Sequence, residues 1–274
     1  MPDPIPRGEL PQPSEFVRTI TSRFPHINGT DASAFEANIG QYGPPEGFFL
    51  RLAHAHQFLD REVFADEITK MATRVSSMTA DYGYDVIIPR RESSNMWILQ
   101  QLLQRGTPIP RKIYNLSVEV QEPEWENDPS ELDVFMFDDI AISGAQIGDS
   151  LRSKITAQSE RTVHVLLLHA TQEAEKYISM QRNPLHDVSV QTIGKPIKLL
   201  TSVLPEGDID FLKTVHIKSI PSGKFIEPFE KDAAVFGMWY KVPDTYPDVL
   251  TGGEYGTLPP LYRSDSIVPP YRTR

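Results

Sequence analysis

One stretch of the sequence constrains the fold more than any other, the segment from residue 133 to residue 154. It opens with the continuous apolar run Val134–Phe137, which predicts a strand buried on both faces, as in a parallel sheet. Asp138 and Asp139 follow where that strand is expected to reach the surface. Ser143-Gly144 then opens a segment whose apolar residues recur at helical spacing. The segment therefore predicts a buried strand, a turn of small residues and a helix.

The chemistry of this segment suits a phosphorylated sugar. The first turn of a helix presents N–H groups without intrahelical partners, together with the positive end of the helix dipole, to a phosphate. The carboxylates of Asp138 and Asp139 offer acceptors to sugar hydroxyls and can hold a hydrated Mg²⁺. Aspartates after a strand also serve as turn formers and helix caps, so a purely structural role remains an alternative.

The same segment resembles the signature of the type I phosphoribosyltransferases. That signature is an apolar strand, two acidic residues, three further residues, a threonine or serine, and a glycine. The resemblance implies that Asp138 and Asp139 are catalytic and hold the ribose hydroxyls of phosphoribosyl pyrophosphate. It also implies a loop for the 5′-phosphate, made of Ile142, Ser143, Gly144, Ala145 and Gln146. Ile142 and Gln146 replace residues that are small or carry a hydroxyl in the family, but the backbone N–H groups of the loop remain.

A second strand, loop and helix precede this segment. Residues 85–88 are apolar enough for a short buried strand, residues 89–94 form a loop, and residues 95–104 follow a helical pattern. Arginines can grip a phosphate with two hydrogen bonds, and serines can cap the helix or donate to an oxygen. By resemblance, this loop would bind pyrophosphate through Arg90, Arg91, Ser93 and Ser94. The alternative is a pair of surface arginines beside a helix cap.

A third region of resemblance lies late in the chain. Residues 232–240 are apolar and predict a strand, and a short segment with a Pro-Asp pair follows. It is similar to the base-recognition segment of the purine phosphoribosyltransferases. The resemblance implies that the base would be bound by Lys241, Val242, Asp244 and Tyr246. The alternative is a Pro-Asp turn after an edge strand.

The order of elements predicts the fold class. A further buried strand over residues 162–169 follows the helix after Ser143-Gly144, and a helix is expected over residues 173–180. Strands that alternate with helices predict an α/β protein with a doubly wound, mostly parallel sheet, which the resemblance identifies as the phosphoribosyltransferase type. His169 is expected at the carboxyl end of its strand, where it would touch a substrate or serve as a capping or surface residue.

The rest of the chain predicts additions to this sheet at both ends. Ser14 is expected to cap a short N-terminal helix, and a second short helix is expected from Asp31. Residues 46–82 follow a mostly helical pattern. Residues 187–220 alternate in parts, as extra strands or an insertion would, with a helical turn expected over residues 208–212. The expected organisation has three parts: residues 1–45 as a proline-rich arm with short helices, residues 46–250 as the α/β domain with an insertion at about 187–230, and residues 251–274 as a proline-rich tail.

Composition narrows the classes of function. The chain has 274 residues, 39% of them hydrophobic, enough for a sizeable core. A formal net charge of −10 argues against a nucleic-acid partner, and the absence of cysteine excludes disulfides and thiolate metal sites. No apolar run reaches membrane-spanning length, and the first residues lack a signal-peptide pattern. We expect a cytoplasmic protein that binds no membrane, with a homodimer as an open possibility.

The resemblance implies an enzyme that transfers the phosphoribosyl group to a base or other acceptor and releases pyrophosphate. It further implies Mg²⁺ held through the substrate rather than directly by side chains. One departure stands against this: the loop at residues 119–131 is acidic, whereas the family's flexible loop commonly carries basic residues. Positive charge would then come from Arg111 or Lys112, or catalysis is altered or lost. The alternatives are a catalytically silent regulatory protein that binds a nucleotide or sugar phosphate, a phosphohydrolase with Asp138 as nucleophile, and an interaction module.

Overall fold

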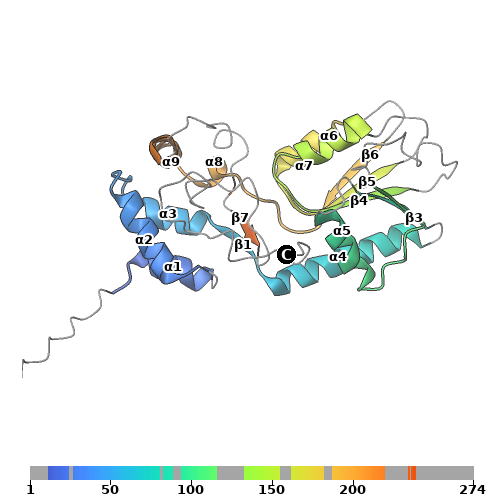
Figure 1. Cartoon of the computed structure of the whole chain (residues 1–274), viewed down its shortest axis with the longest axis horizontal. Coiled ribbons are helices and arrows are strands. Elements are labelled where there is room, and N and C mark those ends of the chain that lie inside the picture. The colour runs from blue at the N-terminus through green and yellow to red at the C-terminus, as the bar shows by residue number, and fades with distance from the viewer. Residues whose placement is uncertain are drawn as a thin grey trace, which may run out of the picture. The chain divides into compact units, whose positions relative to one another are not determined.

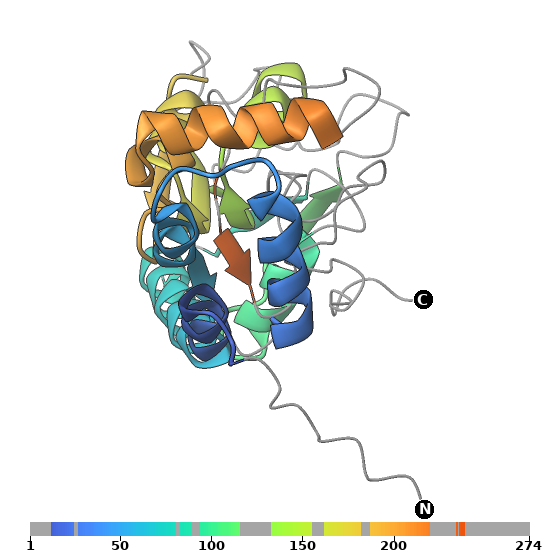
Figure 2. The same ribbon diagram turned by 90° about the vertical axis from the view of Figure 1, so that its left-hand side faces the viewer.

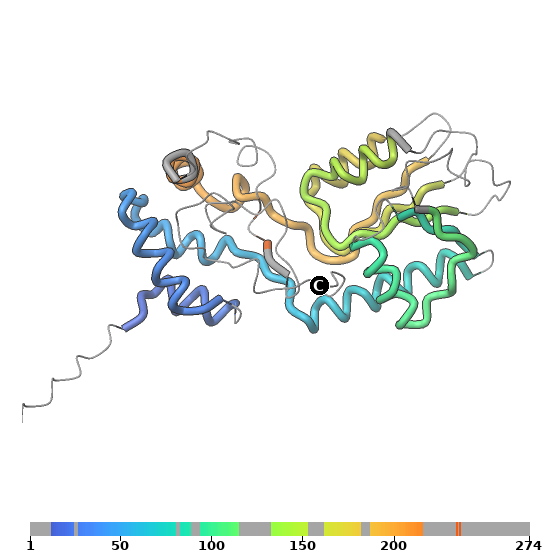
Figure 3. The backbone as a smooth tube through the Cα atoms, in the orientation of Figure 1, coloured from blue at the N-terminus to red at the C-terminus, as the bar shows by residue number. Residues whose placement is uncertain are grey.

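The computed structural model describes residues 12–24, 27–80, 83–88, 94–115, 133–154, 162–181, 187–219, 234 and 236–238 (Figures 1 and 3). The chain divides into two compact units. Unit 1 contains residues up to His56 together with a later segment that begins at Leu204, and unit 2 contains Gln57–Val203 and the short strand near residue 237. This division differs from the expected one, because a segment from the expected insertion belongs with the N-terminal helices.

Helices make up the described part of unit 1 (Figure 2). They are α1 (Glu15–Arg23), α2 (Gly29–Gly40), α3 (Phe48–Ala55) and α9 (Glu206–Ser219). The Ser14 hydroxyl accepts a hydrogen bond from the Val17 N–H at 3.1 Å and so caps α1. The side chain of Asn28 caps α2 by accepting from the Thr30 N–H at 2.8 Å. Both helices expected near the N-terminus are therefore confirmed.

Aromatic contacts and one ion pair hold unit 1 together. The ring of Phe48 lies 4.9 Å from that of Phe211, which joins α3 to α9. The carboxylate of Asp208 is 1% exposed and accepts two hydrogen bonds from Arg51, at 2.7 and 2.8 Å. This hydrogen-bonded contact raises the pKa of the Arg51 guanidinium. Because guanidinium and carboxylate meet in a two-point fork, the pair sets the orientation of α9 against α3.

The extra strands expected across residues 187–220 are only partly present. Val188–Thr192 does form a strand, β6, but α9 replaces the alternating strand expected around Val215. Ile209, Leu212 and Val215 are all buried, and their spacing of three residues places them on one face of a helix. The same apolar residues fit both patterns locally, and packing against unit 1 favours the helix.

The long helical segment expected over residues 46–82 is also wrong in part. A short strand, β1 (Gln57–Leu59), separates α3 from α4 (Arg61–Thr79). Asp60 starts α4 anew, because its side chain accepts from the Val63 N–H at 2.8 Å. β1 pairs in parallel with β7 (Phe236–Met238). That partner lies far along the chain, so local periodicity could not indicate the strand.

A five-stranded sheet forms the centre of unit 2, and all its described pairings are parallel. Its order is β3 (Lys112–Asn115), β2 (Asp85–Ile88), β4 (Val134–Ala141), β5 (Val163–Ala170) and β6. The helices of unit 2 besides α4 are α5 (Ser94–Leu103), α6 (Ala145–Lys154), α7 (Gln172–Ser179) and the short α8 (Leu200–Val203). The expected α/β class with a parallel sheet is confirmed.

Helices cover both faces of this sheet (Figure 1). Phe135 and Phe137 of β4 pack in a cluster with α4 and α5, which includes the stacked rings of Phe64 and Trp97. The alternate residues of β4 pack instead with Ile147 of α6 and with α7. Burial on both faces explains why the strand is continuously apolar.

The helices change from one face of the sheet to the other between β2 and β4. Helix α5 follows β2 and packs on one face of the sheet, whereas α6 follows β4 and packs on the other. β2 and β4 are direct neighbours in the sheet. In open α/β sheets, ligands bind outside the carboxyl ends of strands at such a switch point. The topology thus places the candidate site at the carboxyl ends of β2 and β4.

The opposite, amino-terminal edge of the sheet carries its own ion pair. Asp85 at the start of β2 is fully buried and accepts from Arg111 at 2.8 and 3.1 Å. Lys112 lies in register with Asp85. The expectation that Arg111 or Lys112 supplies positive charge to the site is therefore wrong, because in a parallel sheet the strand starts lie at the edge away from the strand ends.

Tyr84, next to this edge, is fully buried, and its hydroxyl donates to the Pro108 carbonyl at 2.6 Å. Burial raises the pKa of Tyr84 to about 12, so this donor stays protonated across the physiological range.

Among the described residues, no helix combines the length and apolar character that crossing a membrane requires.

Candidate functional site

The two aspartates lie within β4 rather than after it. The predicted strand end at Phe137 is wrong by four residues, because pairing with β5 continues through Ile140 and Ala141. Asp138 is 6% exposed and Asp139 is completely buried. The backbone N–H of Asp139 donates to Asp138 Oδ1 at 2.9 Å. Both aspartates are thus buried, Asp138 slightly less completely than Asp139.

Side chains of β4 alternate between the two faces of the sheet, and this alternation shifts by one residue near the aspartates. Phe137 packs against the α4 and α5 face, and so does Ile140, although strict alternation would place residues three apart on opposite faces. The neighbouring strand β5 changes phase in step, since Leu168 packs on that face and Ala170 on the other. The carboxylates therefore sit where both central strands depart from the regular pleat.

The first residues of α5 hold the end of β4. The Ser94 hydroxyl donates to Asp138 Oδ1 at 2.6 Å. Asn95, which is 2% exposed, donates from its side-chain amide to the carbonyl oxygen of Phe137. The structure thus brings together Ser94, predicted for pyrophosphate, and Asp138, predicted for ribose. Arg90, Arg91 and Ser93 lie outside the described residues, so their predicted role stays a prediction.

Asn95 was missed by sequence reasoning. It stands at the start of a predicted helix, where an asparagine is an ordinary capping residue. Its actual partner is a strand carbonyl 42 positions along the chain. Such a partner leaves no local signal in the sequence.

The predicted 5′-phosphate loop forms the turn from β4 into α6. Gly144 has φ of +73°, and a Cβ placed on it would lie 2.9 Å from the Ala174 carbonyl oxygen and 3.0 Å from Ile178. Only glycine meets both demands, because it accepts the left-handed backbone and leaves room for α7. The Ser143 hydroxyl accepts from the Ala145 N–H at 3.2 Å and caps the start of α6.

Thr171 holds this loop by a hydrogen bond, and the sequence analysis did not identify it as a site residue. Its side chain is completely buried between β5 and α7. Its hydroxyl donates to the Ile142 carbonyl oxygen at 2.5 Å and accepts from the Ala174 N–H at 3.0 Å. A threonine before a helical segment indicates a cap, but nothing in the sequence indicates the bond to Ile142.

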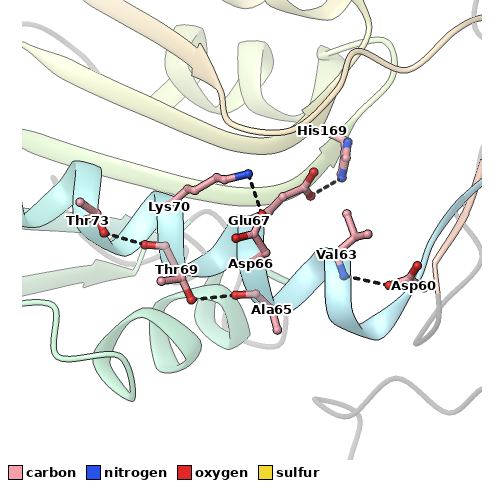
Figure 4. Close-up of polar contacts among 9 residues, drawn as sticks. All are labelled: Asp60, Val63, Ala65, Asp66, Glu67, Thr69, Lys70, Thr73 and His169. Atoms are coloured by element: carbon pink, nitrogen blue, oxygen red, sulfur yellow. Dashed lines mark hydrogen bonds and ion pairs between the residues drawn. The ribbon is translucent and has the colours of Figure 1, made fainter.

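A buried pair of ionisable groups lies at the carboxyl end of β5 (Figure 4). His169 Nε2 lies 2.7 Å from Glu67 Oε2 of α4, and its Nδ1 lies 2.9 Å from the Lys195 carbonyl oxygen. The carbonyl can only accept, so Nδ1 is the donor to it, and Nε2 lies within ion-pair distance of the Glu67 carboxylate. His169 is therefore neither a surface residue nor a simple cap: it joins α4 to β5 and to the segment after β6.

Gly194 allows this pair to approach the backbone. A Cβ on Gly194 would lie 2.6 Å from both Glu67 Oε1 and His169 Cε1. The ring of Phe236 covers the histidine, with centroids 5.2 Å apart. The pair is thus enclosed by four segments of unit 2.

Two predicted features cannot be placed at the site. The residues predicted to bind the base, Lys241, Val242, Asp244 and Tyr246, lie outside the described part of the chain. Within the described residues, no group of three or more histidine, aspartate or glutamate side chains is arranged to hold a metal ion. An ion at Asp138 would need its remaining ligands from a substrate or water.

We expect Ser94→Ala to weaken ligand binding without unfolding the protein. The substitution removes a hydrogen-bond donor to Asp138 Oδ1 and so loosens the carboxylate, while Asn95 still joins α5 to β4. A neutral-to-charged hydrogen bond contributes roughly 1.5–3 kcal/mol, so affinity for the ribose phosphate that the sequence predicts as ligand would fall about tenfold or more. Calorimetric titration measures this. Ser77→Ala serves as control, since that hydroxyl only donates to a carbonyl within α4.

The chain is similar to several solved structures. No protein-family model and no curated protein matches the chain. The solved structure of the xanthine-guanine-hypoxanthine phosphoribosyltransferase of Helicobacter pylori is similar to it, at 14% sequence identity and a TM-score of 0.32. The similarity covers 52% of this chain and 90% of that one. Because the identity and the TM-score are low, the fold assignment rests on the chain's own strand order and two-sided helix packing, which make it a doubly wound α/β protein.

Proposed function

We propose that this protein is a phosphoribosyltransferase-like protein of the type I fold, which binds phosphoribosyl pyrophosphate and transfers its phosphoribosyl group to a base or other acceptor. The observation that carries the proposal is the position of Asp138. It lies in the carboxyl-terminal half of β4, the strand beside the switch point, six residues before Gly144 and the start of α6. This arrangement supports the proposal, because a carboxylate accepts hydrogen bonds from sugar hydroxyls and a helix N-terminus favours a phosphate.

The proposed binding mode assigns each part of the ligand to one element. The ribose hydroxyls donate to Asp138, which Ser94 and the Asp139 N–H hold in place. The 5′-phosphate lies against the backbone N–H groups of the Gly144 turn and the start of α6, where the helix dipole favours an anion. Pyrophosphate is assigned to the loop before α5. The bases proposed as acceptors lie against residues 241–246.

In the proposed reaction the bond from the anomeric carbon to pyrophosphate breaks as an acceptor nitrogen forms its own bond to that carbon. Pyrophosphate leaves with the electron pair, and the acceptor loses a proton. Charge on the leaving pyrophosphate would be neutralised by Mg²⁺ held through the substrate. The protein's share is to position the ribose and to place the Asp138 carboxylate near the positive charge that develops on the sugar.

The proposal is tested by binding of phosphoribosyl pyrophosphate with Mg²⁺. A ligand that binds only the folded state raises the melting temperature, so we expect a rise for the unsubstituted protein. Asp138→Asn is expected to weaken the affinity about tenfold, because one charge-assisted hydrogen bond becomes a neutral one. Asp133→Asn is the control, since Asp133 is half exposed and contacts His164 at the other end of the strand. Unchanged affinity in Asp138→Asn would refute the assignment.

A second candidate is a regulatory protein that binds the same ligand without catalysis. The observation in its favour is that no lysine or arginine occurs between Glu119 and Asp138. A leaving pyrophosphate is then without the cationic loop that would neutralise it. Release of pyrophosphate in the presence of a panel of purine and pyrimidine bases distinguishes the two candidates. Binding without release over that panel would favour the regulatory protein.

A further inference from the structure

In a backbone loop that binds phosphate, the direction of the carbonyl groups affects how strongly the anion is held. An anion is stabilised by N–H groups that face it and is repelled by carbonyl oxygens that do. A loop that binds phosphate must therefore direct its carbonyls away and keep them there. In this chain, the two carbonyls at the start of the turn after β4 belong to Ala141 and Ile142.

One residue, Thr171, donates a hydrogen bond to each of these carbonyls. The backbone N–H of Thr171 donates to the Ala141 oxygen at 3.0 Å, and its hydroxyl donates to the Ile142 oxygen at 2.5 Å. Thr171 is completely buried. A hydroxyl has a single proton, so this donor is fully committed to Ile142. Both carbonyls are thereby drawn toward the start of α7.

The same residue is also attached to α7. Its hydroxyl oxygen accepts from the Ala174 N–H at 3.0 Å, which caps the helix. Ala174 in turn presents the carbonyl oxygen that lies 2.9 Å from the Cβ position of Gly144. The turn after β4 is therefore supported by the first turn of α7 at two separate points.

We propose that Thr171 is a positioning residue for phosphate binding: it holds the carbonyls of Ala141 and Ile142 away from the anion, so that the N–H groups of the following turn remain directed toward the 5′-phosphate of a ribose phosphate. This inference rests on the proposed function. It adds a residue that touches no ligand and acts only through the loop.

The test separates the hydroxyl of Thr171 from its bulk. Thr171→Val keeps the shape of the side chain and removes the hydroxyl, whereas Thr171→Ser keeps the hydroxyl. We expect Thr171→Val to weaken the binding of ribose 5-phosphate about tenfold and to speed amide hydrogen exchange over residues 143–147. Binding of magnesium pyrophosphate, assigned to a different loop, is expected to stay unchanged. Thr171→Ser is expected to bind both ligands as the unsubstituted protein does.

Thr79→Val is the matched control. Thr79 is another buried threonine of unit 2 whose hydroxyl donates to a carbonyl, that of Val75 at 2.9 Å, but it lies at the end of α4. Thr79→Val should change the binding of neither ribose 5-phosphate nor magnesium pyrophosphate. If Thr171→Val does not fold, Thr171→Ala takes its place with the same expected loss.

Two outcomes would overturn the inference, and they differ. Unchanged ribose 5-phosphate binding and unchanged exchange in Thr171→Val would overturn the role of Thr171 and leave the proposed function standing. Failure of the unsubstituted protein to bind ribose 5-phosphate and phosphoribosyl pyrophosphate alike would overturn the proposed function, and the inference with it.

Discussion

Gly144→Ala is expected to lower the free energy of unfolding by about 3 kcal/mol and to eliminate measurable binding of a ribose phosphate. A left-handed backbone costs a residue with a side chain about 1–2 kcal/mol, and overpacking adds about 1–3 kcal/mol. The overpacking arises because the new methyl group would lie 2.9 Å from a backbone oxygen of α7, which cannot rotate away. Relief requires the turn to move, and this displaces the N–H groups assigned to the phosphate.

Gly83→Ala provides a control with the same backbone. Gly83 also has φ of +73°, but a Cβ there would meet no atom within 4 Å. The free energy of unfolding of Gly83→Ala should fall only by the cost of the left-handed backbone, about 1 kcal/mol. Ligand binding should be unchanged. Chemical denaturation of the two variants measures the difference. Equal losses in both would show that the close approach of α7 to the turn is not tight.

His169→Ala is expected to destabilise unit 2 by roughly 3–5 kcal/mol. Removal of one member of a buried ionisable pair leaves the other member in the interior without its partner. Here Glu67 would remain at 8% side-chain exposure without its contact to His169. The loss also leaves a cavity beneath Phe236. Thermal and urea denaturation would both report it.

Two further variants distinguish the charge from the packing. Glu67→Met combined with His169→Leu replaces both members with apolar side chains, and the double variant is expected to recover most of the lost stability. Lys70→Met breaks the neighbouring pair with Asp66, in which both side chains are about 60% exposed, and it should leave stability essentially unchanged. If His169→Ala unfolds no more easily than Lys70→Met, the Glu67–His169 contact does not stabilise the folded state.

The site was predictable from sequence to the extent that its residues adjoin one another in the chain. A strand that contains two aspartates, a glycine turn and a helix form a local pattern, and the structure shows them as β4, Gly144 and α6. The contacts that hold this pattern come from elsewhere. The side chains of Asn95 and Thr171 each donate one hydrogen bond to a backbone carbonyl of the segment, from 42 and 29 positions away. A single hydrogen bond over such a separation imposes no periodicity on the sequence.

The boundary errors have the same origin. The end of β4 was expected at the first charged residue, but hydrogen bonds to β5 continue past both aspartates. The strand β1 was hidden within a helical pattern because its partner β7 begins 179 positions after β1 begins. For α9, helical and strand spacing coincide in the sequence, and burial against its neighbours decides between them.

What the sequence determined by itself was the class of the protein and the order of its elements, since an apolar run buried on both faces and a small-residue turn before a helix are local consequences of side-chain chemistry. What only the tertiary structure decided was the division into two units, the burial of Asp139, the enclosed pair of Glu67 and His169, and the support of the Gly144 turn by α7. Each of these depends on segments that meet in space after folding, and a contact between distant segments is set by packing of the whole core rather than by the residues on either side of it.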